Sequence, residues 1–321
     1  MPGLVRRTIE NNGIQMHIAE MGEGPLVLLI HGFPELWYSW RHQLVALAEA
    51  GYHAVAPDMR GYGRTDAPAS ALEYDIEHLS RDVVGIIDAL EEETAVLVGH
   101  DWGAVVNWQT ALLYPDRFTA LVNLSVPYYG RGEMSAIDIF NSQFGDHFFY
   151  ILYFQEPDLA ENEFDADPRG FLSRLYTSPE TPCEDPEITD PKRSAGGWIP
   201  RLGAPKELPD WLSREDLDYY VAEYKHAGFR GGINYYRNFH RNWEITPQLT
   251  TAQIKHPTLF LAGTEDMVIG GASAEGLEKL MKPSVPGLQE VILFPGIGHW
   301  VQQEAPELVN RALLEFIASV S

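Results

Sequence analysis

The sequence predicts an α/β fold with a doubly wound, mostly parallel sheet and an inserted helical lid. Strand candidates alternate with amphipathic helix candidates up to Leu124, which is typical of such a sheet. The alternation stops after Pro127, where an aromatic stretch with helical periodicity begins, and it resumes at Thr258. We therefore expect a core of residues 1–127 and 251–321, and a helical cap of residues 128–250 with a Pro-rich loop at 178–209.

Each expected element follows from a local pattern. Short apolar or alternating runs bounded by turn residues indicate strands, and these are Ile14–Glu20, Leu26–Ile30, His53–Pro57, Ala95–Val98, Ala120–Leu124, Thr258–Gly263 and Val291–Phe294. Apolar residues at helical spacing indicate helices over residues 75–90, 104–113 and 306–320. Within the expected cap, Ser213 followed by Glu215 and Asp216 is typical of a helix start.

The composition limits the kinds of partner that the chain can have. Its 321 residues are 45% hydrophobic, which is enough for a large core. The formal net charge of −23 argues against nucleic acid and anionic membranes as partners. No apolar run approaches the ~20 residues that span a bilayer, and the first ten residues lack the apolar core of a signal peptide. With a single cysteine, Cys183, we expect a cytoplasmic location. The sequence does not indicate an oligomeric state.

The most informative motif is Gly99-His100-Asp101-Trp102-Gly103, between an apolar strand candidate and a helix candidate. A buried strand that turns sharply into a helix at G-x-nucleophile-x-G presents the central side chain at the tip of the turn. The glycines allow this turn where a Cβ would collide. The alternative reading is that Asp101 only caps the helix, which is a common role for aspartate. As a nucleophile, Asp101 would also gain from the helix N-terminus, which favours an ionised carboxylate.

An aspartate nucleophile indicates displacement at a saturated carbon. A serine that attacks such a carbon would be left as an ether, which water does not cleave at a useful rate. An aspartate is left as an alkyl ester, which water hydrolyses at the aspartyl carbonyl in a second step. Asp101 therefore favours an epoxide or an alkyl halide as the electrophile, and it disfavours an ordinary serine esterase.

The chain also supplies a base and an orienting acid at the ends of expected strands, where open α/β sheets build their sites. His299 follows the last strand candidate, and Asp266 follows the one before it. The order nucleophile, acid, histidine is that of the α/β-hydrolases. Glu265 competes with Asp266 for the orienting role, and the sequence favours neither.

Backbone N–H donors for an oxyanion are available in the stretch His31-Gly32-Phe33-Pro34 and at Trp102. A metal site is not expected, because His31, His100, Asp101 and His299 show no local metal-ligand spacing. The chain has no P-loop and no G-x-G-x-x-G fingerprint, so we expect no cofactor.

These motifs together resemble the soluble epoxide hydrolases of the α/β-hydrolase fold over nearly the whole chain. The stretches that carry the resemblance are His31-Gly32-Phe33-Pro34-Glu35, Gly61-Tyr62-Gly63, Gly99-His100-Asp101-Trp102-Gly103, Leu124-Ser125-Val126-Pro127, Gly298-His299-Trp300, Leu152-Tyr153-Phe154-Gln155-Glu156-Pro157 and Gly231-Gly232-Ile233-Asn234-Tyr235-Tyr236-Arg237-Asn238. One departure is Asp158, where the family usually has glycine.

The resemblance implies a role for each matching residue. Asp101 would be the nucleophile, His299 the base and Asp266 the orienting acid, with backbone oxyanion donors at Phe33 and Trp102. Two lid tyrosines would hydrogen-bond and protonate the oxygen of the opened ring, and the matching positions are Tyr153 and Tyr236. Alternatively, both tyrosines are ordinary core aromatics, and Tyr150 and Tyr235 are the neighbours most easily confused with them.

The sequence thus predicts an epoxide hydrolase that converts a small apolar epoxide and water to a vicinal diol through an ester on Asp101. The first alternative is a haloalkane dehalogenase, which shares the aspartate nucleophile but needs no acid for its leaving halide. The second is a non-catalytic ligand-binding protein on the same fold, for which a complete set of nucleophile, acid and base would serve no purpose.

Overall fold

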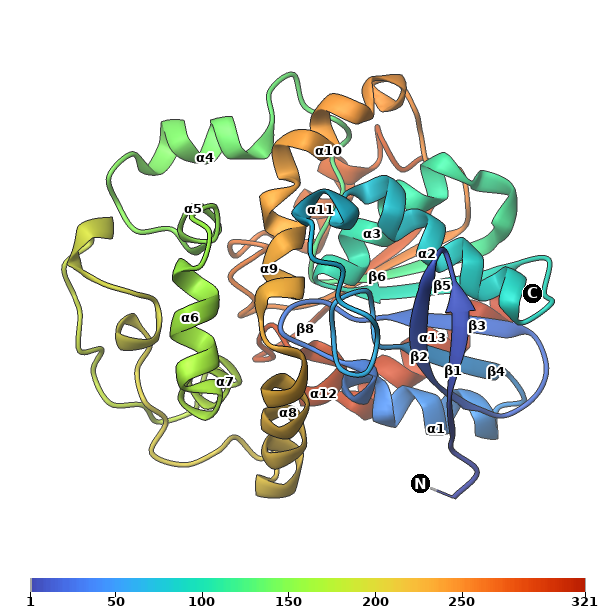
Figure 1. Cartoon of the computed structure of the whole chain (residues 1–321). Coiled ribbons are helices and arrows are strands. Elements are labelled where there is room, and N and C mark those ends of the chain that lie inside the picture. Colours follow the sequence, from blue (N-terminus) through green and yellow to red (C-terminus); the bar gives the residue numbers. More distant parts are fainter. Residues whose placement is uncertain (1, 321) are drawn as a thin grey trace.

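An eight-stranded sheet forms the centre of the molecule in the computed structural model, which describes residues 2–320 (Figure 1). The strand order is β1-β2-β4-β3-β5-β6-β7-β8, with β1, β2 and β4 antiparallel in succession and all other neighbours parallel. The strands are β1 (Val5–Asn11), β2 (Ile14–Met21), β3 (Leu26–Ile30), β4 (His53–Pro57), β5 (Ala95–His100), β6 (Phe118–Leu124), β7 (Thr258–Gly263) and β8 (Leu288–Phe294).

All seven predicted strands are present, several with one to three additional residues. The sequence reading missed β1, which pairs with β2 as a hairpin around Asn12 and Gly13. Both turn residues have positive φ, 49° and 77°, as a two-residue hairpin turn requires, and Asn-Gly is the strongest short-range signal for it. The strand itself is largely exposed, so its pattern lacks the apolar run that identified the others.

Helices cover both faces of the sheet. Successive side chains of a strand point to opposite faces, so that Leu28 packs with α2 and α3 while Leu29 packs with α1 and α13. The helices of the core are α1 (Arg41–Glu49), α2 (Ile76–Ala89), α3 (Trp102–Leu113), α11 (Ala274–Met281), α12 (Val301–Glu304) and α13 (Pro306–Val320). The predicted helix over 75–90 begins at its cap, Asp75, whose side chain accepts the N–H of His78.

Between β6 and β7 lies a helical segment, residues 128–250, which we call the cap segment (Figure 1). Its helices are α4 (Ala136–Phe144), α5 (Tyr150–Tyr153), α6 (Leu159–Ala166), α7 (Pro168–Leu175), α8 (Arg214–Ala227), α9 (Arg230–Arg237) and α10 (Phe239–Ile245). Ser213 caps α8 in a capping box with Asp216, as predicted. Asp158, with a φ of 63°, precedes α6 in the left-handed conformation that favours glycine. Within residues 2–320, no helix has the length and apolarity to cross a membrane.

The sheet topology determines where a site forms. From β3 the chain continues to β4 on one side, and it later returns to place β5 on the other side of β3. The carboxyl ends of β3 and β5 therefore border the point where the strand order reverses, which is where open α/β sheets bind ligands. His31 to Glu35 follow β3, and Asp101 follows β5.

Candidate active site

Asp101 lies at a strained turn between β5 and α3. Its φ is 52° and its ψ −118°, a conformation that L-residues rarely adopt and that functional sites commonly retain. The two glycines of the motif are required by close packing: a Cβ on Gly103 would collide with the carbonyl of Ile30, and one on Gly99 with Asn107. The turn thus holds the Asp101 side chain above the end of the sheet.

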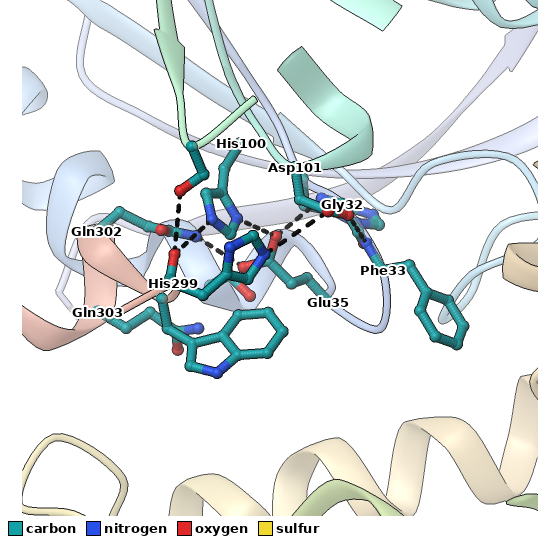
Figure 2. Close-up of polar contacts among 12 residues, drawn as sticks. Gly32, Phe33, Glu35, His100, Asp101, His299, Gln302 and Gln303 are labelled. Carbon is teal, nitrogen blue, oxygen red and sulfur yellow. Dashed lines mark hydrogen bonds and ion pairs between the residues drawn. The ribbon is translucent and has the colours of Figure 1, made fainter. Parts of the chain in front are cut away.

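The two oxygens of the Asp101 carboxylate have different surroundings (Figure 2). Oδ1 accepts the backbone N–H of Phe33 at 2.8 Å, while Oδ2 faces Nε2 of His299 at 3.6 Å. Trp102 is the first residue of α3, where the helix offers its N–H no acceptor. The Asp101 side chain is 14% exposed.

His299 connects two carboxylates. Its Nδ1 lies 3.0 and 3.1 Å from the two oxygens of Asp266, whose side chain is fully buried. Glu265 is exposed and its carboxylate contacts Thr264 instead. Of the two acids that the sequence left open, Asp266 is therefore the one that contacts His299. Glu304 fixes the histidine loop by accepting the N–H groups of Gly298 and Trp300.

The electrostatics of the site follow from this arrangement. Burial alone would lower the pKa of His299, but the carboxylates of Asp266 and Asp101 outweigh it and raise that pKa well above the ordinary value. Burial would raise the pKa of Asp266, and the histidine lowers it instead. The neighbouring charges thus favour an ionised Asp266 beside a protonated His299 in the free protein.

A buried polar network lies beneath the reactive groups (Figure 2). Glu35 and His100 are both fully buried and 2.7 Å apart. Glu35 also accepts the N–H of Gly32 at 2.9 Å and the side-chain amide of Gln302 at 2.7 Å, and His100 contacts the carbonyl of His299 at 2.8 Å. The network links the backbone of the loop after β3, at Gly32, to that of the His299 loop, so it maintains their spacing. Sequence reasoning missed it, since no local spacing connects these positions.

Two tyrosines of the cap segment, Tyr236 and Tyr150, lie close enough to Asp101 for its charge to act on them. Their rings lie 5.9 Å apart, and Tyr236 also packs against Trp102 at 5.1 Å. Burial raises the pKa of both hydroxyls, and the Asp101 carboxylate adds to the increase in each. Both hydroxyls therefore stay protonated near neutral pH.

The structure does not bring Tyr153 beside Tyr236, which corrects the prediction from the sequence that Tyr153 is the first lid tyrosine. The Tyr153 hydroxyl donates to Glu163 at 2.8 Å, and its ring packs against Phe148. Tyr150, at the start of the same short helix, takes the position beside Tyr236. α5 has only four residues, so helical periodicity could not decide which of its tyrosines faces the core.

Close packing and an arginine hold the two tyrosine-bearing helices in place. At Gly232 of α9, a Cβ would lie 2.6 Å from the ring of Phe33 and 2.7 Å from the Tyr62 hydroxyl, so the glycine allows α9 to approach the core. Arg237, at the end of α9, donates to the carbonyl of Phe154 at 2.9 Å and to both carboxylate oxygens of Glu161 at 2.8 Å. It therefore ties the helix of Tyr236 to the segment that follows Tyr150.

A sharp turn after β5 that carries Asp101, with an acid after β7 and a histidine after β8, is the arrangement of the α/β-hydrolase class. A model of the family described as alpha/beta hydrolase fold matches residues 25–306. Epoxide hydrolase A of Mycobacterium tuberculosis is 45% identical over 318 residues, which is 98% of this chain and 97% of that protein. Epoxide hydrolase 3 of Siraitia grosvenorii is 45% identical over 316 residues, 97% of each.

The solved structures agree with the sequence comparison. The crystal structure of epoxide hydrolase A from Mycobacterium thermoresistibile has a TM-score of 0.90 at 45% identity and covers 99% of both chains. An epoxide hydrolase from Vigna radiata gives a TM-score of 0.88 at 41% identity, again over 99% of both chains. The present chain belongs to the epoxide hydrolases of the α/β-hydrolase fold family.

Proposed function

We propose that this protein hydrolyses an apolar epoxide to a vicinal diol in two steps, with Asp101, His299 and Asp266 as the catalytic triad. The observation that carries the proposal is the position of Asp101, which accepts the Phe33 N–H with one oxygen and faces His299 with the other. A carboxylate so placed can form an ester and present its carbonyl to an activated water.

In the first step, Oδ2 of Asp101 attacks a ring carbon. The new carbon–oxygen bond forms as the ring carbon–oxygen bond breaks, and the leaving oxygen takes a proton from Tyr150 or Tyr236. A positioned general acid of this kind contributes ~10²–10⁴-fold to the rate. The raised pKa keeps both phenols protonated before the reaction, and the oxygen of the opening ring is basic enough to take a proton from a weak acid.

In the second step, His299 takes a proton from water, and the resulting hydroxide adds to the carbonyl carbon of the ester. Oδ1 becomes the oxyanion, which the N–H groups of Phe33 and Trp102 would stabilise; one such donor contributes ~2.7–4 kcal/mol in known cases. The bond between the carbonyl carbon and Oδ2 then breaks, and Oδ2 leaves as the second hydroxyl of the diol with the proton that His299 took from water. The carboxylic acid left on Asp101 gives up its proton, which restores the tyrosine and regenerates the Asp101 carboxylate.

Formation of the ester also prepares His299 for its role. The charge of Asp101 is one of the two that raise the pKa of this histidine. The ester is neutral, so esterification removes that contribution and lowers the pKa of His299. The pKa therefore falls before ester hydrolysis, which is the step in which His299 acts as a base.

The experiment that tests the proposal separates the two steps with His299→Gln. This variant should still form the ester but not hydrolyse it, so intact-protein mass spectrometry after incubation with styrene oxide should show one added substrate mass, located in the peptide with Asp101. The matched control, Asp101→Asn in the His299→Gln background, should carry no adduct. Full turnover by His299→Gln, or an adduct elsewhere, would contradict the mechanism.

A further inference from the structure

The hydroxyl of Tyr153 belongs to a cluster that fixes the Pro-rich loop 178–209. The Glu163 carboxylate, in α6, accepts three hydrogen bonds: from the Tyr153 hydroxyl at 2.8 Å, from the Trp198 N–H at 2.9 Å and from the Ile199 N–H at 3.0 Å. A Cβ on Gly197 would collide with the same carboxylate, so glycine at this position allows the loop to approach it this closely. We call Glu163 and its three donors the Glu163 clamp.

The clamp determines where the Trp198 side chain lies. The indole stacks on the ring of Tyr150 with 4.8 Å between centroids and 17° between planes. It also packs against Phe154 and Phe171, each at 5.5 Å. The Pro-rich loop, which has no other assigned role, thus contributes one wall of the pocket that holds Tyr150.

Tyr150 depends on this packing for its position. It is the first residue of a four-residue helix whose N-cap, Phe149, makes no side-chain capping bond. Within residues 2–320 its hydroxyl makes no hydrogen bond, and its ring contacts four aromatic side chains. The contacts with Phe149, Phe154 and Tyr236 are edge-on, whereas the indole covers a face of the phenol ring.

We propose that Trp198 is a positioning residue for Tyr150, held in place by the Glu163 clamp, and that the loop thereby controls ring opening. This inference rests on the proposed function, in which Tyr150 is one of the two phenols that can protonate the epoxide oxygen, and it assigns that step to Tyr150. Trp198 acts only through Tyr150, so its loss affects ester formation and leaves ester hydrolysis at Asp101 and His299 unchanged.

The test measures the two steps separately on the full chain, with styrene oxide as the probe. Ester formation is followed by quench-flow and mass spectrometry in the His299→Gln background, and ester hydrolysis by decay of the adduct in variants that keep His299. A displaced catalytic group costs up to ~100-fold in rate, so Trp198→Ala should slow ester formation by about 10- to 100-fold and hydrolysis by less than about twofold. Trp198→Phe, which keeps a stacking ring, should restore most of the rate.

A variant of the clamp and a matched control complete the set. Glu163→Gln keeps the size of the side chain but can no longer accept from all three donors, so it should also slow ester formation alone. Trp243→Ala removes an indole of the cap segment that packs with His240 and Arg131 rather than with Tyr150 or Glu163, and should change neither rate. Circular dichroism checks the fold of each variant, and if Trp198→Ala does not fold, Trp198→Phe and Glu163→Gln still test the proposal.

The outcomes distinguish this proposal from the proposed function. Normal ester formation in Trp198→Ala, with slow formation in Tyr150→Phe, would reject the positioning role and leave the function standing. Equal losses in both steps would also reject it, since that is the result of a merely structural residue. Normal ester formation in Tyr150→Phe would reject the positioning proposal and assign proton donation to Tyr236, whereas no ester on Asp101 in any variant would reject the proposed function itself.

Discussion

The change Asp266→Asn tests how His299 is held and charged. The wild-type carboxylate lies 3.0 and 3.1 Å from Nδ1 of His299 and also accepts the N–H of Val268 at 2.9 Å. Asparagine keeps the shape but removes the charge that raises the pKa of His299. It also lets an amide N–H face the imidazole, which favours the tautomer with its proton on Nε2, the atom that must accept a proton from water.

The expected loss follows from these contacts. A hydrogen bond to a charged group contributes about 1.5–3 kcal/mol, and each 1.36 kcal/mol is tenfold in rate. Loss of the charge alone should therefore slow ester hydrolysis by about 10- to 160-fold. The wrong tautomer of His299 slows hydrolysis further. The same Asp-to-Asn change in a serine protease triad lowers the rate ~10⁴-fold. We expect the rate of ester hydrolysis in Asp266→Asn to fall by more than the loss of charge alone predicts and by less than in the protease, with ester formation much less affected.

The assay is single-turnover kinetics with styrene oxide, in which the decay of the Asp101 ester is followed by mass spectrometry. The ester should accumulate in Asp266→Asn and decay slowly. Glu265→Gln is the matched control, because it removes the adjacent, exposed acid, and it should behave as the wild type. Normal decay of the ester in Asp266→Asn would refute the reasoning, and a larger defect in Glu265→Gln would transfer the orienting role to that residue.

The remaining predictions concern pH and packing. The pKa of His299 is raised in the folded protein, so its contribution to stability is full below the pKa of the unfolded chain and is lost as the pH rises through the folded value. Asp101→Asn should lower the pKa of His299 measured by NMR, and an unchanged value would show that the Asp101 charge does not act on it. Gly232→Ala should lower the free energy of unfolding by about 1–3 kcal/mol and slow ester formation, because its Cβ would press on Phe33 and Tyr62 beneath α9. Gly132→Ala, at an exposed position where the Cβ stays 3.4 Å from the Met134 carbonyl, is the control for thermal denaturation, and equal Tm values for both variants would contradict the packing argument.

The sequence by itself determined the elements whose information is local. The elbow at Asp101 is encoded by five adjacent residues and two flanking apolar patterns, and the helix over 306–320 by the spacing of its own side chains. The order of Asp101, Asp266 and His299 along the chain was equally readable, because parallel strands bring their carboxyl ends to one edge of the sheet.

Only the tertiary structure decided the questions that depend on side chains from distant segments. Glu35 and His100 are 65 residues apart in sequence, yet they meet at 2.7 Å in a buried network. The choice of Asp266 over Glu265 depended on which carboxylate points at the histidine loop. Tyr150, not Tyr153, lies beside Tyr236, because packing against Trp198 and Tyr236 orients a helix too short to have a periodicity of its own. Local backbone preferences are properties of neighbouring residues, whereas the convergence of side chains is a property of the packed core.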